Sequence, residues 1–408
     1  MLGGVFLAAA LLTIMLGWRE PASVDRRGEF VSLILVSTTG MMLVAAAGDL
    51  ISIFLGIEIL SVALYVLCAL EVWREKSLES GLKYLIIGAV GASILLYGLT
   101  FLFGATGSTS LSEIGDALAG ASFGDEPLVV AAMALIAAGL AFKASAAPFH
   151  MWTPDVYEGA PTTVTAFMAT ATKAAAFAAF LRIFAGALPD LQPDWQAAIA
   201  TLAVVSIVVG NVAALVQTNM KRLMAYSSVA QAGYLLIGVA VGSIQGAEAV
   251  VYYLVAYTAM TIAAFAVIVV REREVEDGDQ LAALTGYGRA RPLIGVVMTL
   301  AMLSLAGFPP LAGFVGKFLL FGSAVEGDLT WLAIVGAVGS MVSLGYYLRV
   351  VTVVWLLPAE GAPRKILRIP GPVLLATVTS GVAIIALALM ASPVIDACRG
   401  AAEALLAP

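Results

Sequence analysis

Apolar residues form long, uninterrupted runs along almost the whole of this 408-residue chain. Runs of about 20 apolar residues recur about twelve times, and a helix of that length crosses the ~30 Å hydrocarbon core of a bilayer. The pattern predicts an all-α, polytopic membrane protein that forms one transmembrane domain over residues 1–408. We expect the spans, the last a C-terminal transmembrane helix, near residues 3–17, 29–47, 50–71, 80–104, 127–147, 161–184, 193–216, 223–244, 246–271, 291–324, 329–357 and 370–391.

The overall composition supports this class of protein. Hydrophobic residues make up 61% of the chain and charged residues only 12%, with a mean hydropathy of +1.01, whereas soluble domains carry roughly 25% charged residues. The length therefore reflects many spans rather than several soluble domains. Two polar stretches, 108–126 and 271–291, are expected at membrane faces, and the middle of the second is expected to form a short interfacial helix.

Lysine and arginine are unevenly divided between the two sets of loops that alternate along the chain. One set holds only Arg182 and Arg399, both close to helix ends. The positive-inside rule makes the other set cytoplasmic, and an even number of spans then leaves both termini on the outer side of the membrane. The basic set consists of Arg19, Arg26, Arg27, Arg74, Lys76, Lys221, Arg222, Arg271, Arg273, Arg289, Arg291, Arg364, Lys365 and Arg368.

Several charged residues lie inside predicted spans, where a charge costs about 2.5–3.5 kcal/mol at the bilayer centre. Glu58 and Lys173 lie deep in their spans, and Lys143 has apolar sequence on both sides. We interpret all three as proton carriers, because burial favours the uncharged form of such a group unless a partner stabilises the charge. The alternatives are a protonated Glu58 bonded to a neighbouring helix and a Lys143 that extends to the membrane surface.

Prolines interrupt two of the spans, and each interruption lies close to a lysine. Pro148 follows Lys143, while Pro309 and Pro310 precede Lys317. Proline breaks a helix, and membrane proteins tolerate such breaks where they line a polar cavity. Transporters commonly use paired broken helices, so the two regions suggest an internal repeat of five spans. Lys317 is then interpreted as a further proton carrier; the alternative is a lysine whose side chain extends to the membrane surface.

Other polar residues are assigned supporting roles or none. Glu79 and Lys83 have the i, i+4 spacing of a helical ion pair, which could serve transport or only anchor the helix at the interface. His150 lies in the first proline-rich break, where it either relays protons between the lysines or binds loop backbone. Asp155 and Glu158 are expected to cap the following helix rather than carry protons.

The sequence offers little for metal or redox chemistry. It has two cysteines, Cys68 in an apolar run and Cys398 near the end, and a single histidine. A disulfide, a cysteine metal cluster and a multi-histidine metal site are therefore not expected. No G-x-G-x-x-G, Walker A or C-x-x-C pattern occurs. We expect no cofactor or metal in this chain, so the energy for proton movement must come from another subunit or from an ion gradient.

Several motifs carry a specific resemblance between about residue 29 and about residue 357. FKASAAPFHMWTPDVYEGAPTTVTAFMATATKAAAF (142–177) resembles the antiporter-like membrane subunits of respiratory complex I, the proton-pumping NADH:quinone oxidoreductase. Its WTPDVYEGAPT portion resembles the bacterial subunit N family. Five further segments also resemble the bacterial subunit N family: LGIEILSVALYVL, SLESGLKYLIIGA, LFGATGS, QTNMKRLMAYSSVAQAGYLL and MLSLAGFPPLAGFVGKF.

The resemblance implies a fold and a function for the chain. It implies two inverted five-helix repeats, here 29–184 and 193–357, each with a broken helix. It implies a membrane-arm subunit that translocates protons, with neighbouring membrane-arm subunits as partners and with FMN, iron–sulfur clusters and quinone in other subunits; no nucleic acid is involved. It also implies that the membrane is a bacterial inner (plasma) membrane, whose outer side is the periplasmic one. The family's functional positions fall on Glu58, Lys143, Lys173 and Lys317, with Glu79 and Lys83 as further charged positions.

One departure and two alternatives accompany this resemblance. The family usually has 14 spans, and Met1 falls at the start of what resembles the third span, which puts assembly rather than the proton path in doubt. The chain could instead belong to a cation/proton antiporter of the same fold. It could also be a scaffold subunit whose buried charges serve packing alone.

Overall fold

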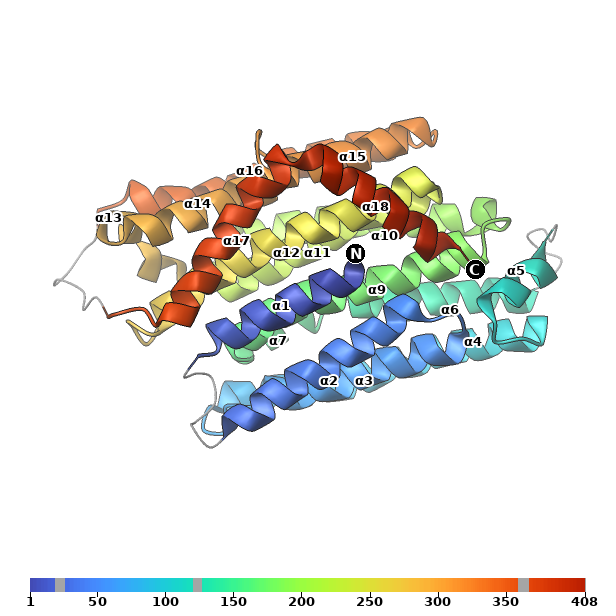
Figure 1. Cartoon of the computed structure of the whole chain (residues 1–408), viewed down its shortest axis with the longest axis horizontal. Coiled ribbons are helices and arrows are strands. Elements are labelled where there is room, and N and C mark those ends of the chain that lie inside the picture. The colour runs from blue at the N-terminus through green and yellow to red at the C-terminus, as the bar shows by residue number, and fades with distance from the viewer. Residues whose placement is uncertain (19–25, 120–126, 359–366, 408) are drawn as a thin grey trace.

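The described part of the chain is a bundle of long helices that run side by side (Figure 1). The computed structural model describes residues 1–18, 26–119, 127–358 and 367–407. Three of the basic residues used for topology, Arg19, Arg364 and Lys365, and part of the polar stretch 108–126 lie outside these ranges. Ten described helices are long and apolar enough to cross a membrane.

The helices follow one another through short connections. In chain order they are α1 (Leu2–Leu16), α2 (Arg27–Ala46), α3 (Leu50–Cys68), α4 (Glu75–Thr106), α5 (Leu111–Leu118), α6 (Pro127–Ala144), α7 (Thr153–Gly159), α8 (Thr162–Phe167), η2 (Met168–Thr172), α9 (Lys173–Phe180), η3 (Leu181–Ala187), α10 (Gln192–Leu215), α11 (Met220–Val241), α12 (Ile244–Glu272), η4 (Leu281–Leu284), α13 (Tyr287–Ala290), α14 (Pro292–Ala306), α15 (Ala312–Glu326), α16 (Thr330–Trp355), α17 (Gly371–Leu389) and α18 (Ala391–Leu406).

The all-helical, multi-span prediction is confirmed, with two adjustments. The first expected span is the shorter helix α1, which has 15 residues. Helix α18 follows the last expected span and was not predicted. The break expected in the span 291–324 is present, between α14 and α15. The short interfacial helix expected in the loop 271–291 is present as η4, followed by α13.

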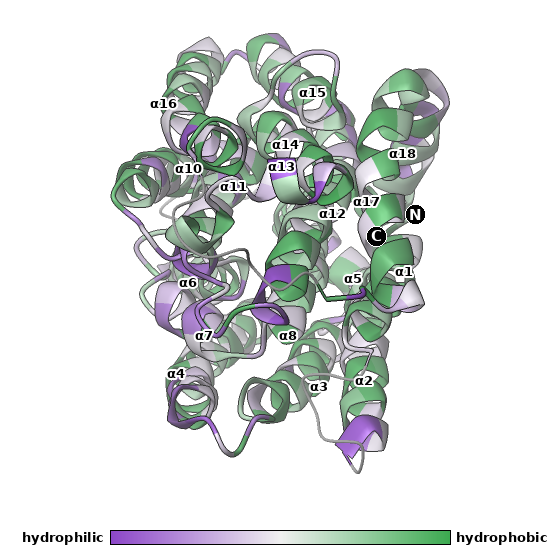
Figure 2. Cartoon of the chain, turned by 90° about the vertical axis from the view of Figure 1, so that its left-hand side faces the viewer, coloured by the Kyte–Doolittle hydropathy of each residue, from purple (hydrophilic) through white to green (hydrophobic). Residues whose placement is uncertain are grey.

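Three helical stretches form the centre of the bundle. The continuous stretch Thr162–Ala187 is 100% buried over its most apolar window, and α11 and α12 are each 94% buried. The helices around them are far more exposed, with α2, α4, α16 and α17 each buried over less than half of the corresponding window. Figure 2 shows the bundle end-on, with hydrophobic helices throughout and hydrophilic residues gathered in the loops that face the viewer. Groups on the central helices are therefore shielded from both lipid and water.

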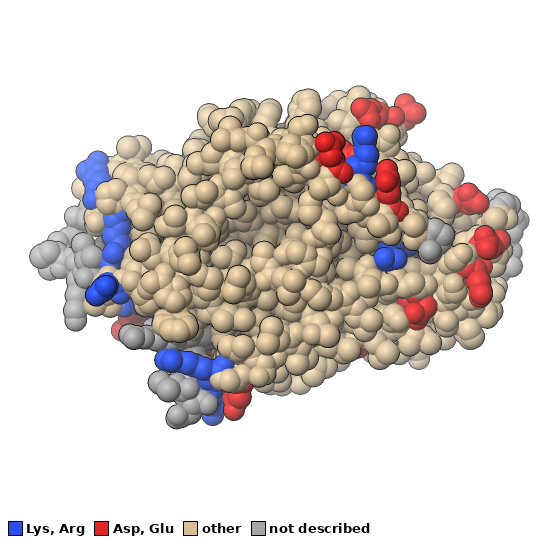
Figure 3. Space-filling view, in the orientation of Figure 1, with Lys and Arg blue, Asp and Glu red and all other residues tan. Residues whose placement is uncertain are grey.

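On the face of the molecule that Figure 3 shows, the charged residues lie at the two ends of the bundle. Figure 3 shows most Lys and Arg at the end that carries α13 and most Asp and Glu at the opposite end, with a wide uncharged belt between them. We refer to these as the basic end and the acidic end. A belt without charges is what a hydrocarbon environment requires.

Close helix packing depends on glycine at several contacts, of which α10 against α11 is a clear example. A Cβ on Gly210 would lie 2.4 Å from the backbone nitrogen of Ala230 and 2.8 Å from the carbonyl oxygen of Tyr226. Small residues at membrane helix interfaces allow this kind of backbone approach. The two helices could accommodate a side chain at Gly210 only by moving apart.

We expect Gly210→Ala to destabilise the protein by about 1–3 kcal/mol, the usual cost of overpacking a tight core. Gly322→Ala on α15 is the matched control, because a Cβ there meets nothing within 4 Å and alanine also favours the helix. The measurement is the thermal unfolding midpoint of the two variants in detergent. Equal midpoints for both would show that the α10–α11 contact does not require glycine.

Candidate functional site

Two helices break inside the bundle, as the prolines predict. Helix α6 ends at Ala144, Ser145 has a left-handed backbone with φ of 61°, and α7 begins only at Thr153. Helix α14 ends at Ala306, Gly307 has φ of 87°, and α15 begins at Ala312. A helix that ends leaves its last carbonyl groups without partners inside the helix. Each break therefore places free acceptors in the interior of the bundle.

Lys173 binds the end of the first broken helix. Its ammonium Nζ lies 2.6 Å from the carbonyl oxygen of Ala144 and 3.0 Å from that of Ser228 on α11, and the residue is 2% exposed. Lys173 directly follows the π-helical turn η2 in an otherwise helical span. Such turns occur frequently at functional sites. The lysine thus connects the break to the central helix α11.

Lys317 binds the end of the second broken helix in the same manner. Its Nζ lies 3.0 Å from the carbonyl oxygen of Leu305, 3.1 Å from that of Ala306 and 2.9 Å from Oγ of Ser340. The ammonium also lies 4.6 Å from the ring centroid of Tyr234, a cation–π contact. Only 3% of Lys317 is exposed. Lys173 and Lys317 therefore both sit at the negative end of a helix dipole.

Lys143 has a different environment, which includes an acidic group. It lies on α6 and donates to Oγ of Ser61 on α3 at 2.8 Å. Glu58 precedes Ser61 by three residues on the same helix face, and its carboxylate acts electrostatically on Lys143. The structure thus brings together the two groups that the sequence placed in separate spans. In the described part of the chain, neither Lys173 nor Lys317 has a carboxylate among its hydrogen-bond partners.

A chain of polar groups joins the surroundings of Lys173 to those of Lys317. Ser227, next to the Ser228 whose carbonyl binds Lys173, shares a hydrogen bond with the hydroxyl of Tyr347. The amide Nε2 of Gln231 donates to that same hydroxyl at 3.1 Å and to the carbonyl oxygen of Leu305 at 3.3 Å. The Leu305 carbonyl is one of the acceptors of Lys317. Gln231 therefore bridges the two lysine sites through fully buried groups.

Further hydroxyl groups extend this chain. Tyr253 donates to Oε1 of Gln231. On the other side of Lys317, the hydroxyl of Tyr234 accepts from the amide of Asn211 at 3.1 Å, and Tyr346 donates to the same amide at 3.0 Å. Hydroxyl and amide groups can both donate and accept. The surroundings of Lys317 thus offer many groups that could exchange protons or hold water.

A cluster of ion pairs lies at the basic end and fixes the short helix α7. The expected pair of Glu79 and Lys83 is present at 2.7 Å, and Lys83 also pairs with Asp155 at 3.0 Å. Arg222 on α11 pairs with Asp155 at 2.8 Å and with Glu158 at 3.0 Å. The expectation that Asp155 and Glu158 cap the next helix is wrong, since α8 has no side-chain cap and both carboxylates lie in α7. They bind cations of α4 and α11 instead.

The ion pairs lower the pKa values of both α7 carboxyl groups. Burial raises the pKa of Asp155, but the hydrogen bonds from Arg222 and Lys83 outweigh it and hold the pKa below its ordinary value of 3.8. The pKa of Glu158 is likewise below its ordinary value of 4.5, because Lys76 and Arg222 outweigh the effect of burial. A carboxyl group whose pKa is lower in the folded state than in the unfolded state stabilises the fold at any pH above its unfolded-state pKa. That stabilisation is lost as the pH falls through its folded-state pKa. The cluster is therefore fully charged at neutral pH.

We expect the protection of the α7 amides against hydrogen exchange, corrected for intrinsic rates, to stay constant between about pH 5 and pH 8. Asp155→Asn should lower that protection throughout this range, because it removes the partner shared by Lys83 and Arg222. Asp190→Asn is the control, since Asp190 is an exposed acid in a loop beyond η3. Unchanged α7 protection in Asp155→Asn would show that the ion pairs do not hold this helix.

His150, proposed as a relay, lies in the break between α6 and α7. Its described aromatic neighbour is Tyr226 on α11, with ring centroids 6.4 Å apart. None of the described hydrogen bonds joins His150 to Lys143 or Lys173. Burial lowers the pKa of His150, which favours the neutral imidazole.

A further buried lysine, Lys221, lies outside the predicted spans. Lys221 was assigned to a cytoplasmic loop, but it is fully buried in the first turn of α11, where it donates to the carbonyl oxygen of Ala160 at 2.7 Å. The nearby Glu272 accepts from Thr162 at 2.7 Å and acts electrostatically on Lys221. The signal in the sequence is Asn219, because asparagine is a favoured N-cap. Its side chain does cap α11, which places Lys221 in the first turn of the helix rather than in a loop.

A bundle with two broken helices and a lysine bound at each break defines an antiporter-like membrane subunit. The chain belongs to the NADH:quinone oxidoreductase/Mrp antiporter transmembrane family, whose model matches residues 47–343. The resemblance seen in the sequence is thereby confirmed.

Individual relatives and solved structures agree with this family. The chain is 42% identical to NADH-quinone oxidoreductase subunit N of Moorella thermoacetica over 99% of its own length and 84% of that protein. It is 44% identical to the subunit N of Trichlorobacter lovleyi over 87% of its length and 73% of that protein. A chain of respiratory complex I from Thermus thermophilus superposes with a TM-score of 0.82 at 40% identity, covering 97% of this chain and 85% of that one. A chain of the Mrp complex from Dietzia sp. shares the fold, with a TM-score of 0.87 at 22% identity over 100% of this chain and 84% of that one.

Proposed function

We propose that this chain is a membrane-arm subunit of a proton-pumping NADH:quinone oxidoreductase and that it translocates protons through Glu58, Lys143, Lys173 and Lys317. The observation that carries the proposal is the polar chain through Gln231, which connects two buried lysines bound to the carbonyls of helix breaks. Electron transfer from NADH to quinone, with FMN and iron–sulfur clusters, takes place in partner subunits. Relatives named as subunit N and the complex I structure support this assignment.

The environments of the lysines support a stepwise transfer. Burial favours the neutral amine, while the carbonyl acceptors and helix ends favour the ammonium, so small changes in the surroundings decide whether each lysine holds its proton. Glu58 supplies such a change for Lys143, because its carboxylate stabilises the ammonium only while it stays charged and near. A proton released toward Lys173 would then reach Lys317 along the groups around Gln231.

We further propose that residues 29–184 and 193–357 are inverted repeats. Corresponding turns support this relation: Asp49 forms an isolated backbone bridge with Ser110, just before α5, and Asn219 forms one with Gln280, just before η4. Asp49 and Asn219 also cap α3 and α11, the second helices of the two units. Figure 1 shows α5 and α13 at opposite ends of the bundle, as inversion requires. The basic end is proposed to face the cytoplasm, with both termini on the periplasmic side.

The first test of transport replaces Lys173 with alanine in the intact complex. We expect Lys173→Ala to abolish most proton uptake per electron while the complex still assembles, because no other described side chain donates to the Ala144 carbonyl. Proton uptake and quinone reduction are measured in the same vesicles, with Arg289→Ala, which removes an exposed positive charge of α13, as the control. Unchanged uptake per electron in Lys173→Ala would favour the scaffold function instead.

The second test addresses the bridge between the lysines. We expect Gln231→Leu to reduce proton uptake per electron about tenfold, the effect of removing roughly 1.4 kcal/mol from the transfer step, with a leucine of similar size leaving the packing intact. Gln196→Leu is the matched control, because within the described residues the side chain of Gln196 donates to the carbonyl oxygen of Ala240 near the acidic end, away from both lysine sites. Normal pumping in Gln231→Leu would place the route between Lys173 and Lys317 elsewhere.

A further inference from the structure

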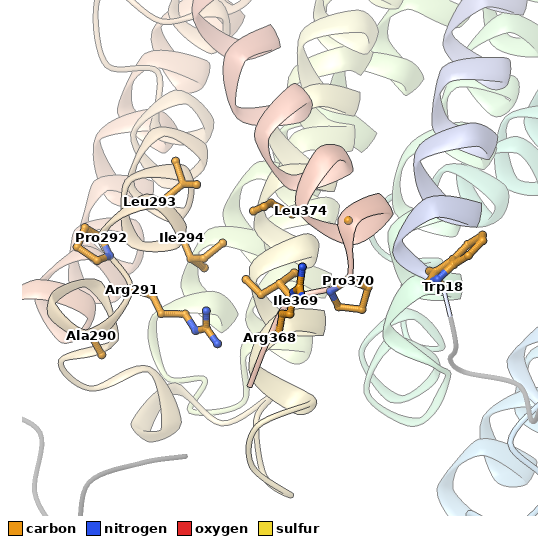
Figure 4. A pocket seen from close by; sticks show the side chains of 11 residues that line it. Trp18, Ala290, Arg291, Pro292, Leu293, Ile294, Arg368, Ile369, Pro370 and Leu374 are labelled. Atoms are coloured by element: carbon orange, nitrogen blue, oxygen red, sulfur yellow. The ribbon is translucent and has the colours of Figure 1, made fainter. Parts of the chain in front are cut away.

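A cavity of about 870 Å³ opens at the basic end of the bundle, where three helices begin or end (Figure 4). It is lined by Trp18 after α1, by residues 290–294 at the start of α14, and by residues 368–371 together with Leu374 at the start of α17. Figure 4 shows Arg291 on one side of the start of α17 and Trp18 on the other. None of the lysines of the candidate site lines this cavity.

The cavity carries an excess of positive charge. Arg291 pairs with Glu274 through Nε at 2.8 Å and Nη2 at 2.6 Å, and its Nη2 also donates to the carbonyl oxygen of Leu367, so an anion would meet mainly its Nη1. The same carboxylate also pairs with the buried Arg271 at 3.0 Å, so one acid neutralises only one of two arginines. Arg368 adds a further guanidinium on an exposed residue. The N-termini of α14 and α17, which start at Pro292 and Gly371, add the positive ends of two helix dipoles. The cavity is therefore suited to an anion that guanidinium groups can bind through several hydrogen bonds.

An apolar groove continues from this cavity into the belt of the bundle. A second cavity of about 570 Å³ lies between α1, α12 and α17, and its lining is almost entirely apolar. Met15 in the groove and Trp18 in the charged cavity are one turn apart along α1, and Leu375 and Leu374 are neighbours on α17. The groove extends back along α1 to Met1. At 1.5 Å per residue this is about 20 Å, longer than the ~15 Å thickness of one hydrocarbon leaflet.

We propose that the two cavities together bind one anionic phospholipid, with its phosphate at Arg291 and Arg368 and an acyl chain in the groove between α1 and α17. Trp18 lies at the junction, where tryptophan commonly sits at headgroup level. Basic pockets between transmembrane helices on the cytoplasmic side bind anionic headgroups. The site rests on the proposed orientation, with the basic end at the cytoplasmic face, but it is separate from the lysines of the proton route and does not depend on proton transfer through them.

The test uses the intact, delipidated complex and a phosphatidylglycerol with a photoreactive group on its acyl chain. Labelled peptides of α1 and α17 are quantified by mass spectrometry, with phosphatidylcholine as the zwitterionic comparison and inorganic phosphate as a competitor. We expect Arg368→Gln to weaken phosphatidylglycerol labelling about fivefold, the contribution of one basic residue at a membrane surface. Arg289→Gln is the control with the same change in charge, because Arg289 is exposed nearby but does not line the cavity. Ala8→Trp should block acyl labelling, since Ala8 lines the groove.

Three outcomes would overturn the proposal. Absence of labelling in the complex would mean that another element covers the groove between α1 and α17. Equal labelling by phosphatidylcholine, or equal effects of Arg368→Gln and Arg289→Gln, would remove the role of the arginines. Displacement of phosphatidylglycerol by millimolar inorganic phosphate would assign the charged cavity to a free anion rather than to a lipid.

Discussion

The interaction on which the interior depends is a lysine ammonium bound to the carbonyl groups of an interrupted helix. A helix that stops inside a membrane leaves acceptors that lipid cannot satisfy, and a buried lysine leaves donors that lack water. Lys173 on the Ala144 carbonyl and Lys317 on the Leu305 and Ala306 carbonyls resolve both problems together. Each lysine also has one partner outside the break, Ser228 for Lys173 and Ser340 for Lys317, so the break and the lysine each supply part of what the other requires.

The features that follow from local sequence were predictable. Hydropathy located the membrane helices, and Pro148 and the pair Pro309–Pro310 located both breaks, because proline acts on its own helix. The ion pair of Glu79 and Lys83 followed from helical spacing. In each case the determining residues are neighbours along the chain or share one helix face.

The contacts between helices were not predictable from one sequence. Nothing in the apolar runs shows that Lys173 reaches α6 and α11, or that Gln231 bridges Tyr347 and Leu305. The position of Asp155 just before a span predicts a helix cap, whereas its actual partners, Lys83 and Arg222, are 72 and 67 residues away along the chain. Hydropathy also placed the start of α11 a few residues too late, which moved the buried Lys221 into a loop. Tertiary partners, rather than local propensity, decide whether such a charge is solvated.

The three proposed carrier lysines differ in what can change their charge. Lys143 has Glu58 nearby, so movement or protonation of that carboxylate alters its preference directly. Lys173 and Lys317 are bound mainly to neutral carbonyl and hydroxyl oxygens, whose positions are set by the ends of α6 and α14 and by α11. A change at these two sites must therefore act through backbone geometry or through hydrogen bonds such as those of Gln231. The ion pairs that hold α7 against α4 and α11 restrain the first break. The span that carries Lys173 departs from regular α-helical hydrogen bonding on both sides of α9, at η2 directly before Lys173 and at η3. Helix α11 is the element that connects the two halves, because Ser228 accepts from Lys173 and Gln231 donates to the Leu305 carbonyl that also binds Lys317.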